Sequence, residues 1–318
     1  MGSTGNPEVI LFDYQYAPNA QKARNLLNLV GVPYSICEQP FVQPRPILQN
    51  LGITYRRMPV NSIGKDVYID NRVFLDAVLT LFAHEKGVQE LVKTKHDEGY
   101  EAFGYRMFWN LLEILPDTVY VEDMIQDRKD LYSMLSKPDY REVRPSAVAA
   151  FKQFMDYIEH DFLGDGKPWI AGDKPGIADH HAAWIPMFAF YTIDYEHGAG
   201  AGKEGEGFSV EDYPRTHKWL KQFRQHTTEN EAPKISGDDA TEKILKLPYA
   251  AKEIDVEDDA TGMKKGDKVQ IATTDDTTPG NMPQYGVLIG LNRKEQVIEL
   301  ENGLRVHFPR IGYSLKKA

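Results

Sequence analysis

The apolar residues near the start of the chain follow first the pattern of a strand and then that of a helix. Val9 to Asp13 is a short apolar run typical of a buried strand, and residues 21–30 have the spacing of a helix that ends at Gly31. Residues 32–37 predict a second strand. A strand, a helix and a strand within about 30 residues predict a βαβ unit with parallel strands.

The next stretch predicts a hairpin followed by a helix. Met58 and Pro59 lead into a strand, a turn at residues 64–65 and a second strand at residues 67–69. Asp70 and Asn71 then precede a run of helical spacing, and both residue types favour helix N-caps. If the Met58–Pro59 bond is cis, the main chain of Met58 faces outward, opposite a helix start that can hold a charged α-amino acid end. The pattern therefore predicts a clamp for a short peptide, with an ordinary turn and helix start as the alternative.

The remainder of the chain changes from helical to strand patterning. Residues 82–244 are mainly helical, and Tyr105, Phe108 and Trp109 lie on one long helix that ends before Pro116. The glycine-rich stretch 198–207 is interpreted as a surface loop, because it lacks the rest of a phosphate-loop motif. After an acidic linker, short strands are predicted at residues 269–271, 285–289, 297–300 and 304–308. They suggest a small SH3-like barrel.

The strand, proline, hairpin, acid-polar pair and helix resemble the thioredoxin-like domain of the glutathione transferase superfamily. The resemblance implies that Pro59 is cis, that Met58 pairs with the cysteinyl backbone of glutathione, and that Asp70 and Asn71 hold its γ-glutamyl group. Asn71 stands where Ser or Thr is usual. The run from Trp169 to Asp179 resembles the sixth-helix capping motif of the same superfamily, with Asp179 in a folding role.

The resemblance directs attention to the turn before the first helix, where relatives carry a Ser, Cys or Tyr beside the glutathione sulfur. Ala17 and Ala20 occupy two of these positions and have no reactive group. Asn19 is then the first candidate to donate a hydrogen bond to a thiolate, and Tyr14 and Tyr16 are alternatives. A plain turn residue at Asn19, and half-buried rings at the two tyrosines, are the competing interpretations.

Further binding residues follow from the same resemblance. Pro18 is assigned to the cofactor site with the turn that contains it, and Arg45 is a candidate donor to the glycine carboxylate of glutathione. A solvated side chain is the alternative for Arg45. Tyr105, Phe108 and Trp109 would line the hydrophobic substrate pocket, with plain core as the alternative.

The fold class expected is α/β plus all-α plus small all-β. The predicted domains are a thioredoxin-like glutathione-binding domain at 7–84, an all-helical substrate domain at 90–250 and a small β-barrel at 262–318. The longer match, which includes the FDY, PRP, YRR and YID segments, is similar to an ascomycete fungal branch of the superfamily, some members of which carry such a tail.

Composition and charge exclude several functions. A net charge of −10 argues against nucleic acid or an anionic membrane as partner. No apolar run reaches the roughly 20 residues of a membrane span, and the first residues lack a secretory signal, so a cytoplasmic location is expected. Cys37 is the only cysteine, which excludes an internal disulfide. No metal site is predicted, because the adjacent residues His180 and His181 point apart on a helix.

The leading hypothesis is a glutathione transferase-like enzyme that adds the thiol of glutathione to a small, hydrophobic electrophile, with a secondary metabolite as the expected substrate. One alternative is a glutathione-dependent or cofactor-free isomerase or tailoring enzyme of fungal metabolism. Another is a non-catalytic binding or regulatory protein, which the two alanines at 17 and 20 favour. The sequence is compatible with a homodimer but does not determine the oligomeric state.

Overall fold

The computed structural model describes residues 7–193, 207–228, 232–274 and 282–318, so residues 198–206 of the glycine-rich stretch lie outside it. The chain forms two compact units. The sheet unit comprises residues 1–23, 31–88 and 229–318, and the helical unit comprises residues 24–30 and 89–228. The predicted division into three domains stays a prediction.

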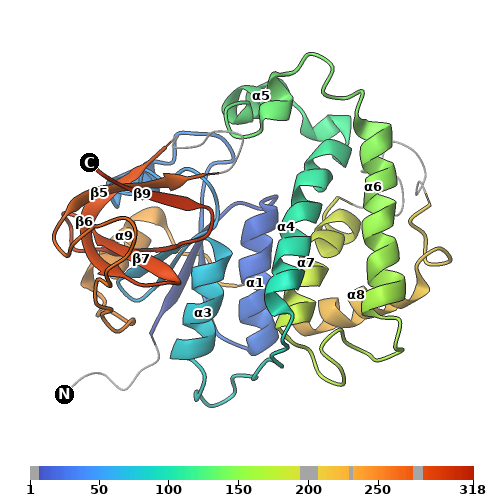
Figure 1. Cartoon of the computed structure of the whole chain (residues 1–318), viewed down its shortest axis with the longest axis horizontal. Coiled ribbons are helices and arrows are strands. Elements are labelled where there is room, and N and C mark those ends of the chain that lie inside the picture. The colour runs from blue at the N-terminus through green and yellow to red at the C-terminus, as the bar shows by residue number, and fades with distance from the viewer. Residues whose placement is uncertain (1–6, 194–206, 229–231, 275–281) are drawn as a thin grey trace. The chain divides into compact units, whose positions relative to one another are not determined.

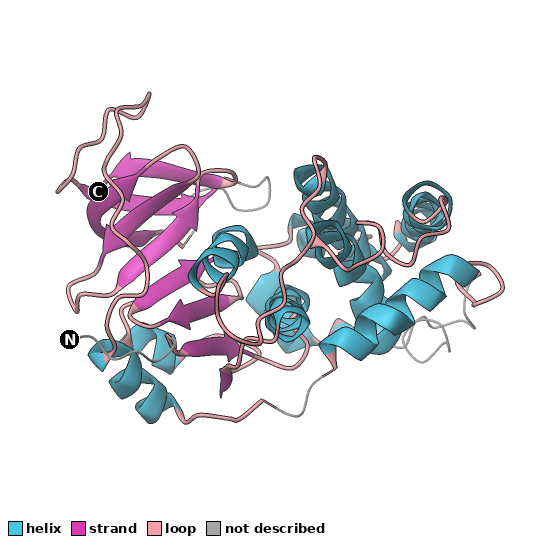
Figure 2. Ribbon diagram, turned by 90° about the horizontal axis from the view of Figure 1, so that it is seen from below, coloured by secondary structure: helices cyan, strands magenta, loops and turns pink. Residues whose placement is uncertain are grey.

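The described residues of the sheet unit form one nine-stranded sheet in the order β2-β1-β3-β4-β8-β7-β6-β5-β9, drawn in magenta in Figure 2. Its strands are β1 (Val9–Asp13), β2 (Ser35–Glu38), β3 (Val60–Ile63), β4 (Asp66–Ile69), β5 (Lys268–Thr273), β6 (Gln284–Leu291), β7 (Glu295–Glu299), β8 (Arg305–Pro309) and β9 (Tyr313–Lys317). Its helices are the first part of α1 (Pro18–Val30), α2 (Pro46–Asn50), α3 (Asn71–Leu81) and α9 (Gly237–Lys246).

The first four strands have the predicted thioredoxin-like arrangement. Strands β1 and β2 are parallel, and β3 is antiparallel to both β1 and β4. Helix α1 begins at Pro18, three residues before the predicted start, because proline suits the first helical position, where its missing N–H is not needed. Strand β2 begins at Ser35 rather than at residue 32.

The C-terminal strands continue this sheet. Strand β8 runs parallel to β4, with Asp66 opposite Arg305 and Tyr68 opposite His307. Strands β5 to β9 are compatible with the small barrel tail that the sequence predicts, although the sheet stays open: β9 pairs with β5 and β8 with β4. The last strand, β9, was not among the predicted ones.

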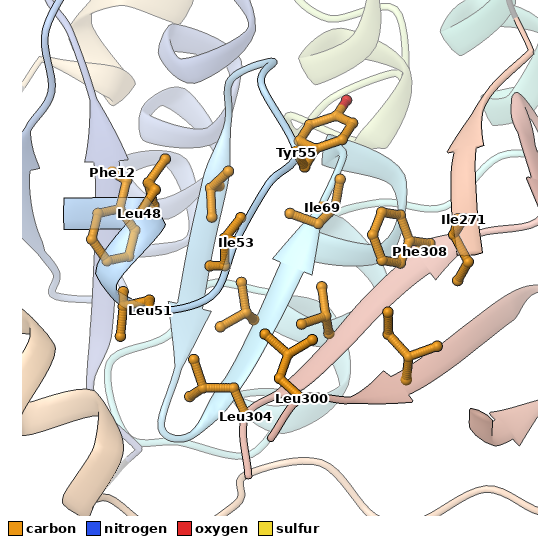
Figure 3. Packing of buried hydrophobic residues seen from close by; sticks show 14 of the residues in the cluster. Phe12, Leu48, Leu51, Ile53, Tyr55, Ile69, Ile271, Leu300, Leu304 and Phe308 are labelled. Carbon is orange, nitrogen blue, oxygen red and sulfur yellow. The ribbon is translucent and has the colours of Figure 1, made fainter. Parts of the chain in front are cut away.

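One hydrophobic layer crosses the junction between the two groups of strands. Figure 3 shows Ile69 of β4 beside Phe308 of β8, which in turn lies beside Ile271 of β5. These three side chains are completely buried. Since the layer is continuous, the N-terminal and C-terminal strands share one core.

The acidic segment predicted as a linker is held against the sheet. Val256 bridges Leu291, the last residue of β6. The main-chain N–H groups of Ala250 and Ala251 both donate to Oδ2 of Asp66, at 2.6 and 2.9 Å. Asp66 is completely buried. We call residues 250–257 the strap.

The helical unit has the predicted all-helical character (Figure 1). Its helices are the second part of α1, α4 (Asp97–Ile114), α5 (Glu122–Arg128), α6 (Arg144–Asp156), α7 (Ile177–Tyr191) and α8 (Pro214–Thr227), with short 3-10 turns at Asp117–Val119 and Ser133–Ser136 and a π-helical turn at Tyr157–Phe162. Helices α4 and α7 cross closely at Gly104, where an added Cβ would lie 2.7 Å from the carbonyl oxygen of His181.

Asp179 fixes the start of α7, as the capping motif predicts. Its carboxylate accepts hydrogen bonds from the main-chain N–H groups of Gly176, Ile170 and Ala171, at 3.0, 2.7 and 3.2 Å. The indole of Trp219 in α8 donates to the same carboxylate at 2.8 Å. Asp179 therefore ties together the approach to α7 and the helix α8.

Candidate functional site

The ends of three strands meet at one edge of the sheet unit. Val60, the first residue of β3, pairs with Phe12 on one side and with Ile69 on the other. Pro59 therefore lies at the same edge as the residues that follow β1 and as Asp70, which follows β4. Strand register alone brings together the predicted clamp and the predicted catalytic turn.

Asn71 links the two helix starts at this edge. Its Nδ2 donates to the main-chain oxygen of Asn19 at 2.9 Å. Asn71 is 9% exposed, and its Oδ1 is buried and has no hydrogen-bond partner among the described residues. A buried acceptor without a partner is rare, because its desolvation is uncompensated. This oxygen therefore has acceptor capacity that the described residues leave unused.

The Met58–Pro59 bond is cis, as the resemblance implies, and both residues are buried. In the described part of the chain, no hydrogen bond reaches the main-chain N–H or C=O of Met58. Main-chain groups that lack a partner are the ones that an extended peptide can pair with.

Asp70 has an unusual backbone conformation, with φ 84° and ψ 143°. Residues other than glycine rarely hold such angles, and those that do cluster at ligand sites. Its Oδ1 accepts the main-chain N–H of Arg72 at 2.9 Å, which caps α3, and lies 3.8 Å from Nε of the same arginine. The side chain of Asp70 is 23% exposed, so a ligand can reach it.

The turn before α1 presents the side chain of Asn19. This residue is half-buried, and within the described residues its amide side chain has no hydrogen-bond partner. Pro18 opens the helix. Ala17 and Ala20 are 2% and 1% exposed, so their methyl groups belong to the core.

The two tyrosines of the turn differ in position. Tyr14 is half-buried, and its ring packs edge-on against Phe41 at 5.4 Å. Tyr16 is 53% exposed. Asn19 is therefore the side chain of this turn whose surroundings fit the predicted role best.

The guanidinium of Arg45 is engaged by the protein itself. It donates to the main-chain oxygens of Pro40 at 3.2 Å, Phe41 at 3.5 Å and Arg56, and Arg45 is 4% exposed. Its Cζ lies 5.4 Å from the centre of the Tyr14 ring. These contacts hold the loop before β3 and favour a folding role over the predicted contact with a ligand carboxylate.

The three aromatic residues of α4 lie in the helical unit. Phe108 is 5% exposed and stacks on Trp184 at 5.5 Å, as a core residue does. Tyr105 and Trp109 are half-buried and meet edge-on at 6.1 Å. A role in the hydrophobic core therefore fits Phe108 better than it fits Tyr105 or Trp109.

Sequence analysis missed the side chains that the C-terminal strands bring to the site. Tyr313, the first residue of β9, donates from its hydroxyl to Oδ2 of Asp70 at 3.3 Å. Nη1 of Arg72 donates to the main-chain oxygen of Ile311 at 2.6 Å. The alternation of Tyr313 and Leu315 after Gly312 was the available signal for a strand, but nothing local indicates where that strand lies.

A cavity of about 210 Å³ lies between the strap and strands β6 to β8. Arg305 lines it and is paired there with Glu253 at 2.6 Å, while its Cζ lies 3.6 Å from the centre of the Tyr249 ring. The lining also includes Lys252, Lys265 and Glu299. Because cations and carboxylates are mixed here, the lining does not select one ligand charge.

Other ionisable groups fit structural roles. Cys37 is buried, and burial raises the pKa of its thiol to about 11, so it stays protonated. The rings of His180 and His181 are 5.5 Å apart, and in the described ranges no three His, Cys, Asp or Glu residues are placed to hold a metal ion. Nor does any helix in those ranges have the length and apolar character to cross a bilayer.

Comparison with known proteins gives the fold. A GST-like protein from Pseudomonas syringae is similar over 98% of this chain and 100% of its own, with 23% identity and a TM-score of 0.73. A glutathione S-transferase of Ceriporiopsis subvermispora, solved in complex with glutathione, is similar over 71% of this chain and 100% of its own, with 16% identity and a TM-score of 0.53. These likenesses show a glutathione transferase-like fold.

The sequence comparisons are less informative. The family described as a domain of unknown function (DUF7962) matches residues 112–232, of which 112–228 belong to the helical unit. No curated protein matches the chain. The Pseudomonas syringae likeness extends over nearly the whole chain, so the C-terminal strands are part of what the two structures share.

Proposed function

We propose that the sheet unit binds glutathione and that the protein is a glutathione transferase-like enzyme acting on a small electrophile. One observation carries the proposal: the main chain of Met58 has no partner in the described residues, at the edge of the sheet where Asp70 and Asn71 begin α3. The glutathione S-transferase of Ceriporiopsis subvermispora, which has a similar fold, was solved in complex with glutathione.

The residues at this edge fit the γ-glutamyl and cysteinyl parts of the tripeptide. Met58 would pair with the cysteinyl main chain through its N–H and C=O. The carboxylate of Asp70 would form an ion pair with the α-ammonium group. Oδ1 of Asn71, which has no partner in the described residues, would accept a hydrogen bond from the same group. Asn19 would then be near the sulfur, because it lies in the turn before α1, at the same edge of the sheet as Met58.

When bound, glutathione supplies a thiol nucleophile. The first N–H groups of α1 point toward the turn, and a helix N-terminus stabilises a thiolate and lowers its pKa. The amide of Asn19 adds a donor for the sulfur. These groups would raise the fraction of thiolate near neutral pH, with the thiol proton released to water. The sulfur then adds to the electrophilic carbon as the π bond of that carbon breaks, and the displaced electron pair takes up a proton from water.

Turnover of a generic electrophile with glutathione tests this proposal. We expect saturable turnover that falls by about 10-fold or more in Asn19→Ala, since one hydrogen bond to a charged group contributes about 1.5–3 kcal/mol. Gln15→Ala is the matched control in the same turn and should leave the rate unchanged, because Gln15 is exposed and has no role in the proposed site. Equal rates in wild type and Asn19→Ala would remove Asn19 from the chemistry.

A non-catalytic binding or regulatory protein is the second candidate. It is favoured by Ala17 and Ala20, whose buried methyl groups stand where relatives have Ser or Cys. Tight glutathione binding without turnover would support this candidate, or an isomerase or tailoring enzyme that uses glutathione differently.

Four further properties of the protein are proposed from the sequence. They are a fungal origin with a barrel extension, a hydrophobic electrophile of secondary metabolism bound near Tyr105 and Trp109, a homodimer and a cytoplasmic location. The half-buried state of both rings supports the substrate proposal.

A further inference from the structure

The hydroxyl of Tyr313 lies 3.3 Å from Oδ2 of Asp70, although the two residues are 243 positions apart. A second phenol, that of Tyr55, lies 2.9 Å from the Tyr313 hydroxyl. An ionised carboxylate only accepts hydrogen bonds, so Tyr313 donates to Asp70 and Tyr55 donates to Tyr313. The result is a chain of two phenols that ends on the carboxylate proposed to hold the ligand.

Packing fixes the position of this phenol pair. The Tyr313 ring meets that of Tyr55 at 6.2 Å and that of Phe308 at 5.5 Å. The main chain of Tyr313 pairs with Thr273 in the ladder between β5 and β9. Figure 3 shows Tyr55 above Ile69, which is the residue before Asp70. Because both rings are packed, the direction of the bond to Asp70 is set by the C-terminal strands.

The phenol remains a donor at ordinary pH. Burial raises the pKa of Tyr313 well above its usual value, and the neighbouring Tyr55 and Asp70 raise it further. A phenol that stays protonated is a constant hydrogen-bond donor to the carboxylate.

The carboxylate of Asp70 keeps acceptor capacity for a ligand. Oδ1 accepts the N–H of Arg72 and Oδ2 accepts the hydroxyl of Tyr313. A carboxylate has about four acceptor positions, so about two remain. With one donor on each oxygen, the carboxylate cannot rotate freely.

We propose that Tyr313 is a positioning residue that orients Asp70 toward the α-ammonium group of the bound peptide. The inference rests on the proposed function and deepens it. The C-terminal strands become part of the ligand site, and the ligand class is a peptide whose γ-linked first residue has a free α-amino group. Tyr55 contributes indirectly, because its hydroxyl is hydrogen-bonded to that of Tyr313.

Calorimetric titration of the full chain with two ligands tests this role. The ligands are glutathione and glutaryl-cysteinylglycine, which differ only in the α-amino group. We expect the wild type to prefer glutathione by about 10-fold or more. Tyr313→Phe keeps the ring and removes the donor, and should reduce this preference by about 3- to 10-fold. Tyr55→Phe should give a smaller reduction, and Tyr285→Phe, at an exposed position of β6, none.

The readout separates positioning from stability. A variant that is only less stable would weaken both ligands equally and leave the preference unchanged, which would overturn the inference while the proposed function stood. If wild type bound neither ligand, the proposed function and the inference would both fail. A preference that is reduced in Tyr313→Phe, with unfolding midpoints close to wild type, would support the inference.

Discussion

The imidazole Nε2 of His307 in β8 lies 3.1 Å from Oδ1 of Asp66 in β4, across the seam where the C-terminal strands join the N-terminal sheet. Nδ1 of the same ring lies 3.2 Å from Glu295 of β7, and the ring stacks on Tyr68 at 4.6 Å. His307 and Asp66 are both buried. One side chain therefore connects three strands at the junction.

The first prediction concerns the pH dependence of stability at this seam. Burial lowers the pKa of His307, but hydrogen bonds to Asp66 and Glu295 outweigh it, so the pKa is raised above 6.5. A raised pKa in the folded state contributes stability that is complete below the unfolded pKa and is lost as pH rises through the folded pKa. Between these two values, stability should fall by up to about 1.4 kcal/mol per pH unit.

Urea unfolding from about pH 6 to pH 9 measures this dependence. The difference in free energy of unfolding between wild type and His307→Gln should shrink as pH rises. His84→Gln, at an exposed position of the sheet unit, serves as the control and should run parallel to wild type. A difference that stays constant across this range would contradict the charged state assigned to His307.

The second prediction compares two glycines of α4. Replacing glycine by alanine within a helix normally stabilises it by about 1 kcal/mol. At Gly104 an added Cβ would lie 2.7 Å from the carbonyl oxygen of His181, so Gly104→Ala should instead destabilise by about 1–3 kcal/mol. A Cβ added at Gly99 would have no neighbouring atom within 4 Å, so Gly99→Ala should be neutral or stabilising. Chemical unfolding of both variants tests the close approach of α4 and α7, and equal effects would count against it.

The third prediction concerns Asp179. Its buried carboxylate accepts four N–H donors, and Asp179→Asn replaces one accepting oxygen by a donor that faces other donors. The free energy of unfolding should fall by about 3–5 kcal/mol. The exposed Asp173→Asn is the control from the same segment and should change stability by less than about 0.5 kcal/mol. Similar midpoints for the two variants would show that the capping network contributes little.

The fourth prediction separates folding from binding at Arg45. Lysine cannot span the three carbonyl oxygens that the guanidinium reaches, so Arg45→Lys should destabilise by about 2–4 kcal/mol. Arg293→Lys, at an exposed position, should be neutral. If Arg45→Lys instead kept wild-type stability and lost glutathione affinity, the ligand contact predicted from the sequence would be the better account.

Features that depend on neighbouring residues were predictable from the sequence. The hairpin around Gly64, the helix start at Asp70 and the cap at Asp179 each follow from residue types a few positions apart, and the structure has all three. Strand register then places Met58 near Asp70 without further information.

Features that depend on distant partners were not predictable in this way. The pairing of β4 with β8 joins residues more than 200 positions apart, and no residue pattern in either strand indicates which strand it pairs with. The contact of Tyr313 with Asp70 follows from that pairing. Arg45 was predicted to contact the glycine carboxylate of glutathione, with a solvated side chain as the alternative. Its actual partners are main-chain oxygens, which the sequence does not distinguish.

The most direct test of the account is titration of the full chain with glutathione, for wild type and Asp70→Asn. Asparagine still caps a helix, so the variant removes the charge and leaves the start of α3 in place. We predict that wild type binds with a Kd of about 1 mM or tighter and that Asp70→Asn binds at least about 10-fold more weakly. Absence of binding heat for wild type at about 10 mM glutathione, or equal affinity of the two proteins, would contradict the site proposed at the edge of the sheet.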